Sequence, residues 1–148
     1  PRGRAGRYIK MYFERIPGVT AYMDELIERA RRDGYAETIL GRKRRIPELS
    51  RRGAAKAYGE RIARNTPIQG SAADILKVAM IEVEGLLESR PWAEMLLTVH
   101  DELIFECEQG HEDELVELVK PAMEEAVKLS VPLVVDGGRG HSWAEAKG

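Results

Sequence analysis

Two strand-length apolar runs, "AEMLLTV" and "ELIFECE", separated only by His100 and Asp101, constrain this fold more than any other feature of the sequence. Both have the length of a strand and include β-branched or aromatic residues. Two residues are enough to join antiparallel strands through a tight turn. We therefore expect a hairpin buried in the core, with His100, Asp101 and the neighbouring Glu102 at its tip.

Three further patterns predict long helices. Residues 7–33 carry apolar side chains at helical spacing, interrupted at Pro17 and Gly18, which indicates two helices with a bend between them. Residues 66–69, "TPIQ", have the form of a capping box with Pro67 at a first helical position, so a helix should begin here and end before Pro91. Residues 111–129 form an amphipathic pattern that Pro121 should bend. The expected buried stripe of the middle helix comprises Ile68, Ala72, Ile75, Leu76, Ala79, Met80, Val83, Leu86 and Leu87.

The remaining segments predict short strands and turns. Gly34 should end the second helix, and "YAETILGRKRRIPEL" reads as a hairpin that turns near Gly41 and ends at Pro47. "VPLVVDG" predicts a last strand, followed by a glycine-rich tail whose Trp143 packs onto the core. Helix pairs combined with antiparallel hairpins predict an α+β fold, with the hairpins packed on long helices, and exclude a doubly wound sheet.

The composition limits the class of protein. A chain of 148 residues with 43% hydrophobic content can bury a core without disulfides, and its single cysteine, Cys107, cannot form an internal bridge. The sequence has no signal segment and no apolar run near the ~18 residues that a membrane span requires. We expect a soluble intracellular protein that does not contact a membrane.

The charges are strongly segregated along the chain. Nine basic residues stand against two acids between Arg42 and Arg64, and fourteen acids stand against two bases between Glu82 and Glu125. A basic block of this kind is typical of a surface that binds a polyanion. The alternative is that both blocks are solvated faces of a highly charged domain.

Arg61, Asn65 and Gln69 lie at successive four-residue steps, so a continuous helix would place them on one face. Their side chains donate hydrogen bonds, and every base pair offers similarly placed acceptors in the minor groove of a duplex. Gly70 and Ser71 leave room for close backbone approach. The row could therefore hold DNA without reading its sequence, or it could be an ordinary polar helix face.

The hairpin tip is a candidate metal site because a tight turn on a rigid strand pair holds a ligand accurately. Neighbouring side chains in extended backbone point to opposite sides, so Asp101 is the first candidate ligand and Glu102 a supporting residue. The alternative is a plain turn, since aspartate is common in turns. We call Arg61, Asn65 and Gln69 the donor row, and the hairpin that turns near Gly41 the basic hairpin. Together with the carboxylate at the tip, they suggest phosphoryl chemistry on nucleic acid.

Two segments of the chain, "ERIARNTPIQGSAADILKVAMI" and "LLTVHDELIFE", resemble the carboxy-terminal palm of family A DNA polymerases, the bacterial DNA polymerase I type. "YFERIPGVTAYM", "GYAETILGRKRRIPEL" and "GRGHSWAEAKG" resemble the segments that flank them. The resemblance covers nearly the whole chain in order.

The resemblance implies a role for each candidate residue. Asp101 would be one of two carboxylates that bind Mg²⁺, for which Mn²⁺ could substitute, and Glu102 its acidic catalytic neighbour. His100 would lie near the primer terminus. The partners would be primer–template DNA, deoxynucleoside triphosphates and the remainder of the polymerase. The reaction would add a deoxynucleotide to a primer 3′ end by a two-metal mechanism, during replication or repair in the cytoplasm at the nucleoid. The row of Arg61, Asn65 and Gln69 would contact primer and template.

Other parts of such an enzyme have no counterpart in the sequence. A segment like "DYSQIELR", which carries the family's second metal aspartate, is missing, and so is the fingers helix that grips the nucleotide. We therefore interpret residues 1–148 as a single carboxy-terminal palm-region fragment, with helices at 1–33, a basic hairpin at 34–50 and the palm at 51–148. We expect it to be inactive alone. The alternatives are a non-catalytic nucleic-acid-binding module and a metal-dependent nuclease or phosphatase.

Overall fold

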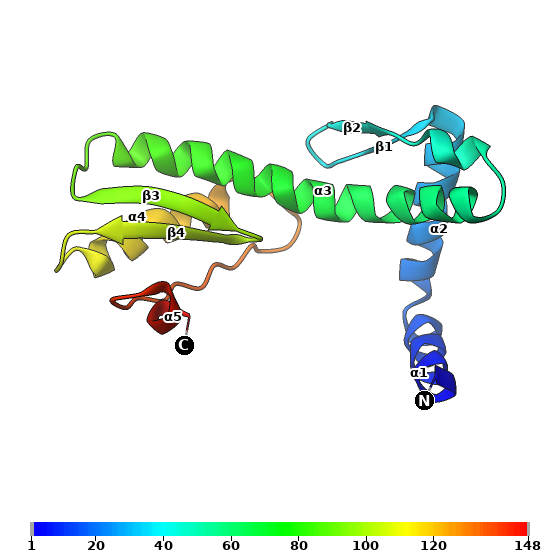
Figure 1. Ribbon diagram of the computed structural model, residues 1–148, viewed down its shortest axis with the longest axis horizontal. Helices are drawn as coiled ribbons and strands as arrows, with labels where there is room; N and C mark the ends of the chain where they lie inside the picture. Colours follow the sequence, from blue (N-terminus) through cyan, green and yellow to red (C-terminus); the bar gives the residue numbers. More distant parts are fainter. Residues whose placement is uncertain (1, 148) are drawn as a thin grey trace. The chain divides into compact units, whose positions relative to one another are not determined.

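A computed structural model describes residues 2–147 of the chain (Figure 1). It consists of helices and two separate antiparallel strand pairs, which confirms the expected α+β class. The chain divides into two compact units, unit 1 up to Ser71 and unit 2 from Ala72 onward. The elements in order are α1 (Arg2–Arg15), α2 (Pro17–Asp33), β1 (Tyr35–Glu37), β2 (Lys43–Arg45), the 3-10 helix η1 (Pro47–Ser50), α3 (Ala54–Leu87), β3 (Ala93–Val99), β4 (Glu102–Cys107), α4 (Glu112–Glu125) and α5 (Trp143–Ala146).

The first two helices of unit 1 meet at Pro17, as the sequence predicts. Pro17 is the first residue of α2, where a proline is tolerated because the first N–H groups of a helix have no intrahelical partner. Gly34 ends α2 in the left-handed conformation, with φ of 78°, and its N–H donates to the Ala30 carbonyl at 2.9 Å. Both predicted helices and the predicted stop are therefore confirmed.

The basic hairpin of unit 1 is also confirmed. Tyr35 pairs with Arg45 and Glu37 with Lys43, and the turn contains Gly41 at φ of 84°. The core beneath it joins α2, the hairpin and the first part of α3, with Leu49 packed against it. Its buried members are Ile27, Ala30, Ala36, Ile46, Ile62 and Ala63. These contacts fix the hairpin against the helix that carries the donor row.

The expected helix start at Thr66 and Pro67 is wrong, because α3 runs through both residues. Pro67 lies inside the helix, where it lacks the N–H that would bond to the Ala63 carbonyl. The Thr66 hydroxyl is buried without a hydrogen-bond partner among the described residues, so it caps nothing. Ile62 and Ala63 are buried in the core, and this packing favours a helix that continues through the sequence that resembles a capping box.

The β3–β4 hairpin of unit 2 has the predicted two-residue turn, but it is less buried than predicted. A bulge interrupts the register between Met95 and Leu97, so that the side chains no longer alternate regularly between the two faces. Leu96 and Leu97 are 49% and 47% exposed. Only one face of the hairpin enters the core.

That core joins the hairpin to α3 and α4, and Figure 1 shows α4 behind the two strands. From α3, the buried residues Ala79, Val83 and Leu87 continue the predicted stripe, whereas Ile68 and Ala72 are exposed, contrary to the prediction. Pro121 lies inside α4, which runs on to Glu125. The core comprises Val83, Leu87, Ala93, Leu115 and Val119, with Trp92, Met95, Phe105, Cys107, Leu118, Ala122 and Met123 packed against it.

The segment after α4 differs from its prediction. Residues 131–137 form no strand, and Val131 and Val134 are largely exposed. Trp143 opens the short helix α5 and remains 47% exposed, so it is not buried in the core as expected. Between residues 2 and 147, no helix is both long enough and apolar enough to span a membrane.

Candidate functional site

The hairpin tip of unit 2 presents His100 and Asp101 to solvent. β3 ends at Val99 and β4 begins at Glu102, and these two residues pair directly across the turn. His100 has a positive φ of 57°, a conformation that histidine adopts more readily than most side chains. The Asp101 carboxylate is exposed and makes no hydrogen bond or ion pair with any residue that the structure describes. The predicted two-residue turn, with His100 and Asp101 at its tip, is confirmed.

Glu102 is in a different situation from Asp101, because its carboxylate is already bound. Lys147 Nζ lies 2.9 Å from Glu102 Oε1. The hydrogen bond and the charge of Lys147 hold the pKa of Glu102 below its ordinary value, and a hydrogen bond from the Trp143 side chain acts in the same direction. Sequence reasoning missed both partners, since no pattern links the tip to residues more than forty positions later.

The donor set at the tip suits a hard cation only in part. A carboxylate oxygen is the ligand that Mg²⁺ prefers, and Asp101 offers one that is exposed. Among residues 2–147 there is no group of three or more His, Cys, Asp or Glu side chains that could enclose a metal ion. This chain can therefore supply one ligand to a metal site but not a complete set.

The donor row lies on α3 in unit 1. Arg61, Asn65 and Gln69 are all exposed, at four-residue steps along one helix. They share this helix because α3 runs through the start that was expected at Thr66. The Arg61 guanidinium lies over the ring of Tyr58 at 5.6 Å from its centroid. Tyr58 was missed from the sequence, although its spacing of three residues from Arg61 was a usable signal. The row belongs to unit 1 and the tip to unit 2.

The space beside Gly70 is filled by the protein's own hairpin, which corrects the expectation that it stays open to a ligand. A Cβ at Gly70 would lie 2.7 Å from Thr38 Cγ2. Arg42 Nη2 donates to the Gly70 carbonyl at 3.1 Å, and the Ile39 N–H donates to Ser71 Oγ at 2.8 Å. The glycine therefore lets the basic hairpin dock on α3, next to the donor row.

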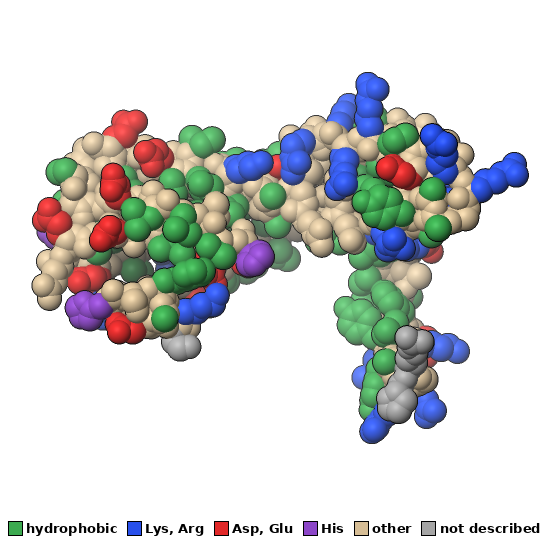
Figure 2. Space-filling model, viewed as in Figure 1, with side chains coloured by type: hydrophobic (Ala, Val, Ile, Leu, Met, Phe, Trp, Pro, Cys, Tyr) green, Lys and Arg blue, Asp and Glu red, His purple; other side chains and the backbone are tan. Residues whose placement is uncertain are grey.

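The surface charges follow the segregation seen in the sequence. Figure 2 shows Lys and Arg side chains gathered over unit 1 and Asp and Glu side chains over unit 2. Within the basic hairpin, Arg44 and Arg45 are exposed, and Lys43 lies over the Tyr35 ring at 4.6 Å. Unit 1 thus offers cations that a polyanion could reach.

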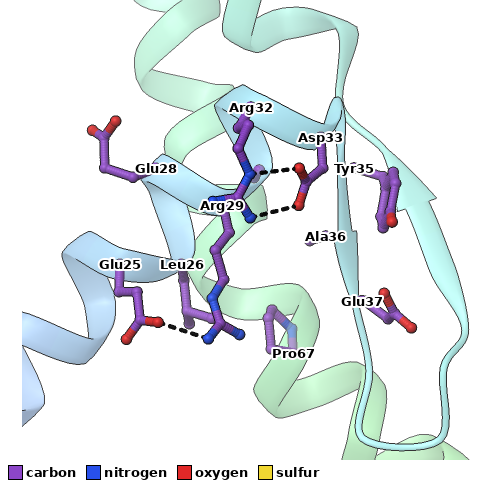
Figure 3. Close-up of a pocket in the computed structure, with 11 residues that line it drawn as sticks. Glu25, Leu26, Glu28, Arg29, Arg32, Asp33, Tyr35, Ala36, Glu37 and Pro67 are labelled. Atoms are coloured by element: carbon purple, nitrogen blue, oxygen red, sulfur yellow. Dashed lines mark hydrogen bonds and ion pairs between the residues drawn. The ribbon is translucent and has the colours of Figure 1, made fainter.

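A shallow pocket of about 420 Å³ lies in unit 1 between α2, β1 and Pro67 (Figure 3). The charged side chains that line it are largely paired with one another. Arg29 contacts Glu25 at 2.7 Å, and the Arg32 guanidinium donates two hydrogen bonds to the Asp33 carboxylate. These pairs raise the pKa of Arg32 and lower that of Asp33.

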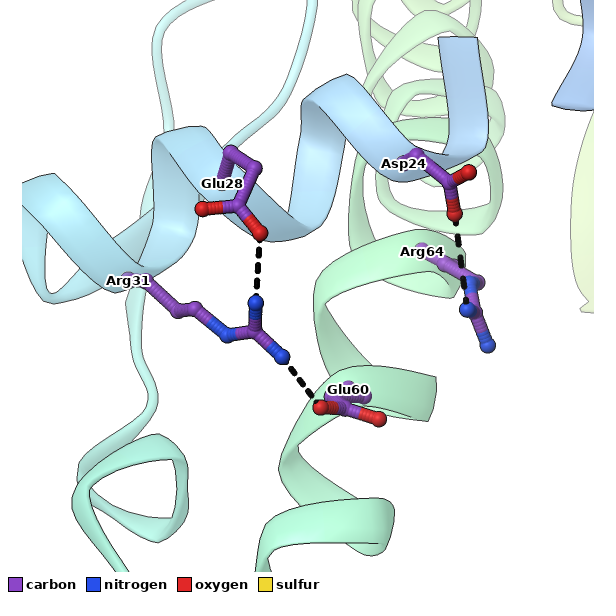
Figure 4. Close-up of polar contacts among 5 residues, drawn as sticks. All are labelled: Asp24, Glu28, Arg31, Glu60 and Arg64. Atoms are coloured by element: carbon purple, nitrogen blue, oxygen red, sulfur yellow. Dashed lines mark hydrogen bonds and ion pairs between the residues drawn. The ribbon is translucent and has the colours of Figure 1, made fainter. Parts of the chain in front are cut away.

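Ion pairs also connect α2 to the first part of α3 (Figure 4). The Arg31 guanidinium contacts Glu28 and Glu60, each at 2.5 Å, and the hydrogen bond to Glu60 is the main cause of the raised pKa of Arg31. Arg64 lies 3.9 Å from Asp24. Several cations of unit 1 are therefore engaged by its own acids, whereas Arg61 faces solvent.

A model of one family, described as DNA polymerase family A, matches residues 1–145. The chain belongs to DNA polymerase family A. It is 48% identical over 148 residues to a DNA polymerase I of Streptococcus pneumoniae and 47% identical to that of Bacillus subtilis. The identity to the thermostable DNA polymerase I of Thermus thermophilus is 42% over 149 residues. The resemblance drawn from the two motif segments is thereby confirmed.

A solved structure, the POL domain of Pol1 from M. smegmatis in complex with DNA primer–template and dNTP, matches with a TM-score of 0.92 and 43% identity. That match covers 100% of this chain and 26% of the other. The alignments to the curated relatives include at least 99% of this chain but only 17–18% of the length of each relative. The match to the family thus includes nearly every residue of this chain. The chain itself spans less than a fifth of the length of these relatives.

Proposed function

We propose that this chain forms part of the palm of a larger DNA-directed DNA polymerase. The observation that carries the proposal is the His100–Asp101 tip, which a two-residue turn holds in the open on a chain that matches family A from residue 1 to 145. The neighbouring structure was solved with primer–template DNA and dNTP, and these are the partners that we propose here. The work of such an enzyme in replication and repair places it in the cytoplasm, at the nucleoid.

We assign Asp101 as a metal ligand because its exposed carboxylate has no protein partner among the described residues. Mg²⁺, or Mn²⁺ in its place, would supply the positive charge that activates the primer hydroxyl and stabilises the departing pyrophosphate. His100 occupies the turn beside Asp101, where we place the primer terminus. Glu102 contributes its negative charge next to the ligand, held in place by Lys147.

The donor row would hold the duplex. Arg61, Asn65 and Gln69 can each donate to the purine N3 and pyrimidine O2 acceptors that all base pairs present in the minor groove. Stacking on Tyr58 limits the freedom of the Arg61 guanidinium, which lowers the entropy lost when it binds. The exposed cations of the basic hairpin would add contacts to phosphates.

The isolated 148-residue chain should not extend primers. A two-metal site needs several carboxylates on both ions, and residues 2–147 contain no cluster of three metal-binding side chains. A suitable test is a chimera in which this chain replaces the matching segment of the Streptococcus pneumoniae DNA polymerase I, which is 48% identical to it. We expect Mg²⁺-dependent primer extension from the chimera and none from the chain alone.

The decisive variant of this chimera is Asp101→Ala. We expect kcat for primer extension to fall by more than about 100-fold, because even groups that only support a metal ligand are worth 10- to 100-fold. Glu94→Ala, on the same hairpin at the end away from the tip, should leave kcat within about two-fold and serves as the matched control. An Asp101→Ala chimera that still extends primers would contradict the assignment.

A non-catalytic nucleic-acid-binding module is the second candidate, supported by the exposed donor row and the basic surface of unit 1. The same chimera separates the two functions. Binding of primer–template DNA without any extension, in a chimera with the melting temperature of its parent, would favour the binding module. Extension that depends on Asp101 would favour the polymerase.

A further inference from the structure

The segment that follows α4 is fastened to unit 2 at several points, although it contains no strand. Val135 N–H donates to Glu124 Oε1 at 2.9 Å, and Arg139 forms an ion pair with Asp113. Both acids belong to α4. A Cβ at Gly137 would lie 3.4 Å from the Val116 side chain, so the backbone passes close to the same helix. The route of this segment is therefore fixed by contacts and not only by its connection to α5.

The glycines of "DGGRG" let this segment fold back directly onto α5. A Cβ at Gly138 would collide with the Ala146 carbonyl oxygen, and one at Gly140 would lie 2.5 Å from Glu145 Cβ. Ser142 caps the helix by accepting from the Glu145 N–H, and the Glu145 carboxylate accepts from the His141 N–H at 2.9 Å. The position of this short helix is therefore fixed by close packing against the two glycines and by hydrogen bonds at its N-terminus.

The position of α5 brings the side chains of Lys147 and Trp143 to the hairpin tip. Lys147 Nζ lies 2.9 Å from Glu102 Oε1 and 5.5 Å from the centroid of the Trp143 ring. Asp101, the adjacent residue, receives no such partner from any described residue. Two neighbouring carboxylates are therefore treated differently, one bound by the chain and one left open.

We propose that Lys147, which lies over the Trp143 ring, is a positioning residue that holds the Glu102 carboxylate away from the metal, so that Asp101 is the only carboxylate of the tip that binds it. The inference rests on the proposed function and deepens it. An unrestrained Glu102 would compete for the ion and move it off the position that Asp101 fixes. Groups that orient the surroundings of a metal ligand commonly control both affinity and turnover.

The first test measures Mn²⁺ binding to the polymerase chimera, using the electron paramagnetic resonance signal of free Mn²⁺. Lys147→Met should release Glu102 as an extra anionic ligand, and an added carboxylate should tighten Mn²⁺ binding by about tenfold. Lys147→Arg keeps the ion pair and should stay within about two-fold of the parent. Lys120→Met is the matched control, because Lys120 also pairs with a carboxylate of unit 2, at 3.9 Å from Glu124, and should have no effect.

A double-mutant cycle with Glu102→Gln distinguishes release of a ligand from a simple loss of charge. If Lys147 acts by holding Glu102, most of the tightening caused by Lys147→Met should vanish in the E102Q background. An equal effect in both backgrounds would show that the lysine acts only through its charge, and would overturn the proposal. So would Mn²⁺ affinity that does not change in Lys147→Met.

Kinetics of the chimera supply the second measurement. Lys147→Met should lower kcat by about tenfold while KM for the nucleotide stays within about two-fold, and Lys147→Arg should restore kcat. Tighter metal binding together with slower turnover is not what damage to the fold would produce. A Lys147→Met chimera with the kcat of its parent would contradict the inference, provided that Asp101→Ala abolishes extension.

A third measurement needs neither metal nor activity. The chain has two tryptophans, and Trp92 stacks on His111, which gives an internal reference. In the NMR spectrum of the 148-residue chain, Glu102→Gln should shift the indole N–H signal of Trp143, assigned with Trp143→Phe, and leave that of Trp92 in place. A Trp143 signal that does not move would overturn the inference. An inactive chimera would instead count against the proposed function.

Discussion

The two units of this chain expose opposite charges and use them differently. Residues 1–71 carry seventeen Lys and Arg against eight Asp and Glu, whereas residues 72–148 carry six against seventeen. In unit 1, acids engage several of the abundant cations, as Glu28 and Glu60 engage Arg31. In unit 2, the rare cation Lys147 engages one carboxylate of the tip. In each unit, the less abundant kind of charge, acidic in unit 1 and basic in unit 2, forms ion pairs with some side chains of the opposite sign. The side chains that it leaves unpaired are the ones that remain open to a ligand.

The largest expected effect tests whether the two units are separate in stability. Each has its own buried cluster, and the largest fully buried side chains are Ile46 in unit 1 and Val83 in unit 2. Ile46→Ala should cost about 2–5 kcal/mol of unfolding free energy by leaving a cavity in the first cluster. Hydrogen exchange should show lost protection in residues 17–63, with little change in β3 and β4.

Val83→Ala is the matched variant for the second cluster and should reverse that pattern at a cost of about 1.5–3 kcal/mol. Equal loss of protection in both units from either substitution would show that they unfold as one cooperative body, and would remove the basis of the comparison.

A smaller effect tests the division of charge. Arg61→Gln, which removes an exposed cation of unit 1, should weaken DNA binding by the chimera about tenfold, because loss of an arginine in contact with DNA costs roughly 1–3 kcal/mol. Lys128→Gln removes an exposed cation from unit 2 in the same way and should change affinity less than about two-fold. Fluorescence anisotropy at two salt concentrations measures both. Equal losses would mean that DNA does not distinguish the units.

The smallest effect concerns the ion pairs within unit 1. Glu60→Gln removes the contact that joins Arg31 on α2 to α3, and it should cost less than about 1 kcal/mol because Arg31 is partly solvated. Glu14→Gln, in the exposed pair with Lys10 on α1, is the control and should cost nothing measurable. Urea unfolding at low and high salt checks both. A cost of several kcal/mol at Glu60 would make the ion pair, and not the apolar cluster, the main link between the helices.

The local elements were predictable where one short pattern determined them. Pro17 and Gly34 bound α2 for reasons contained in their own backbones, and the two residues between β3 and β4 left only a tight turn. The capping box at Thr66 failed because burial of Ile62 and Ala63 outweighed the local signal. "VPLVVDG" failed as a strand because it has no partner strand to complete its backbone hydrogen bonds among the described residues.

The sequence alone determined the family and the exposed tip at Asp101, since each depends on residues close together in the chain. It also showed the four-residue steps of Arg61, Asn65 and Gln69, but packing of the helix onto the core placed them on one continuous helix. Tertiary structure decided what surrounds them. It filled the space at Gly70 with Thr38, and it brought Lys147 to Glu102 across more than forty residues. Contacts at such separations depend on how whole elements pack, which no local spacing encodes. The fold therefore decides which of two adjacent carboxylates stays open.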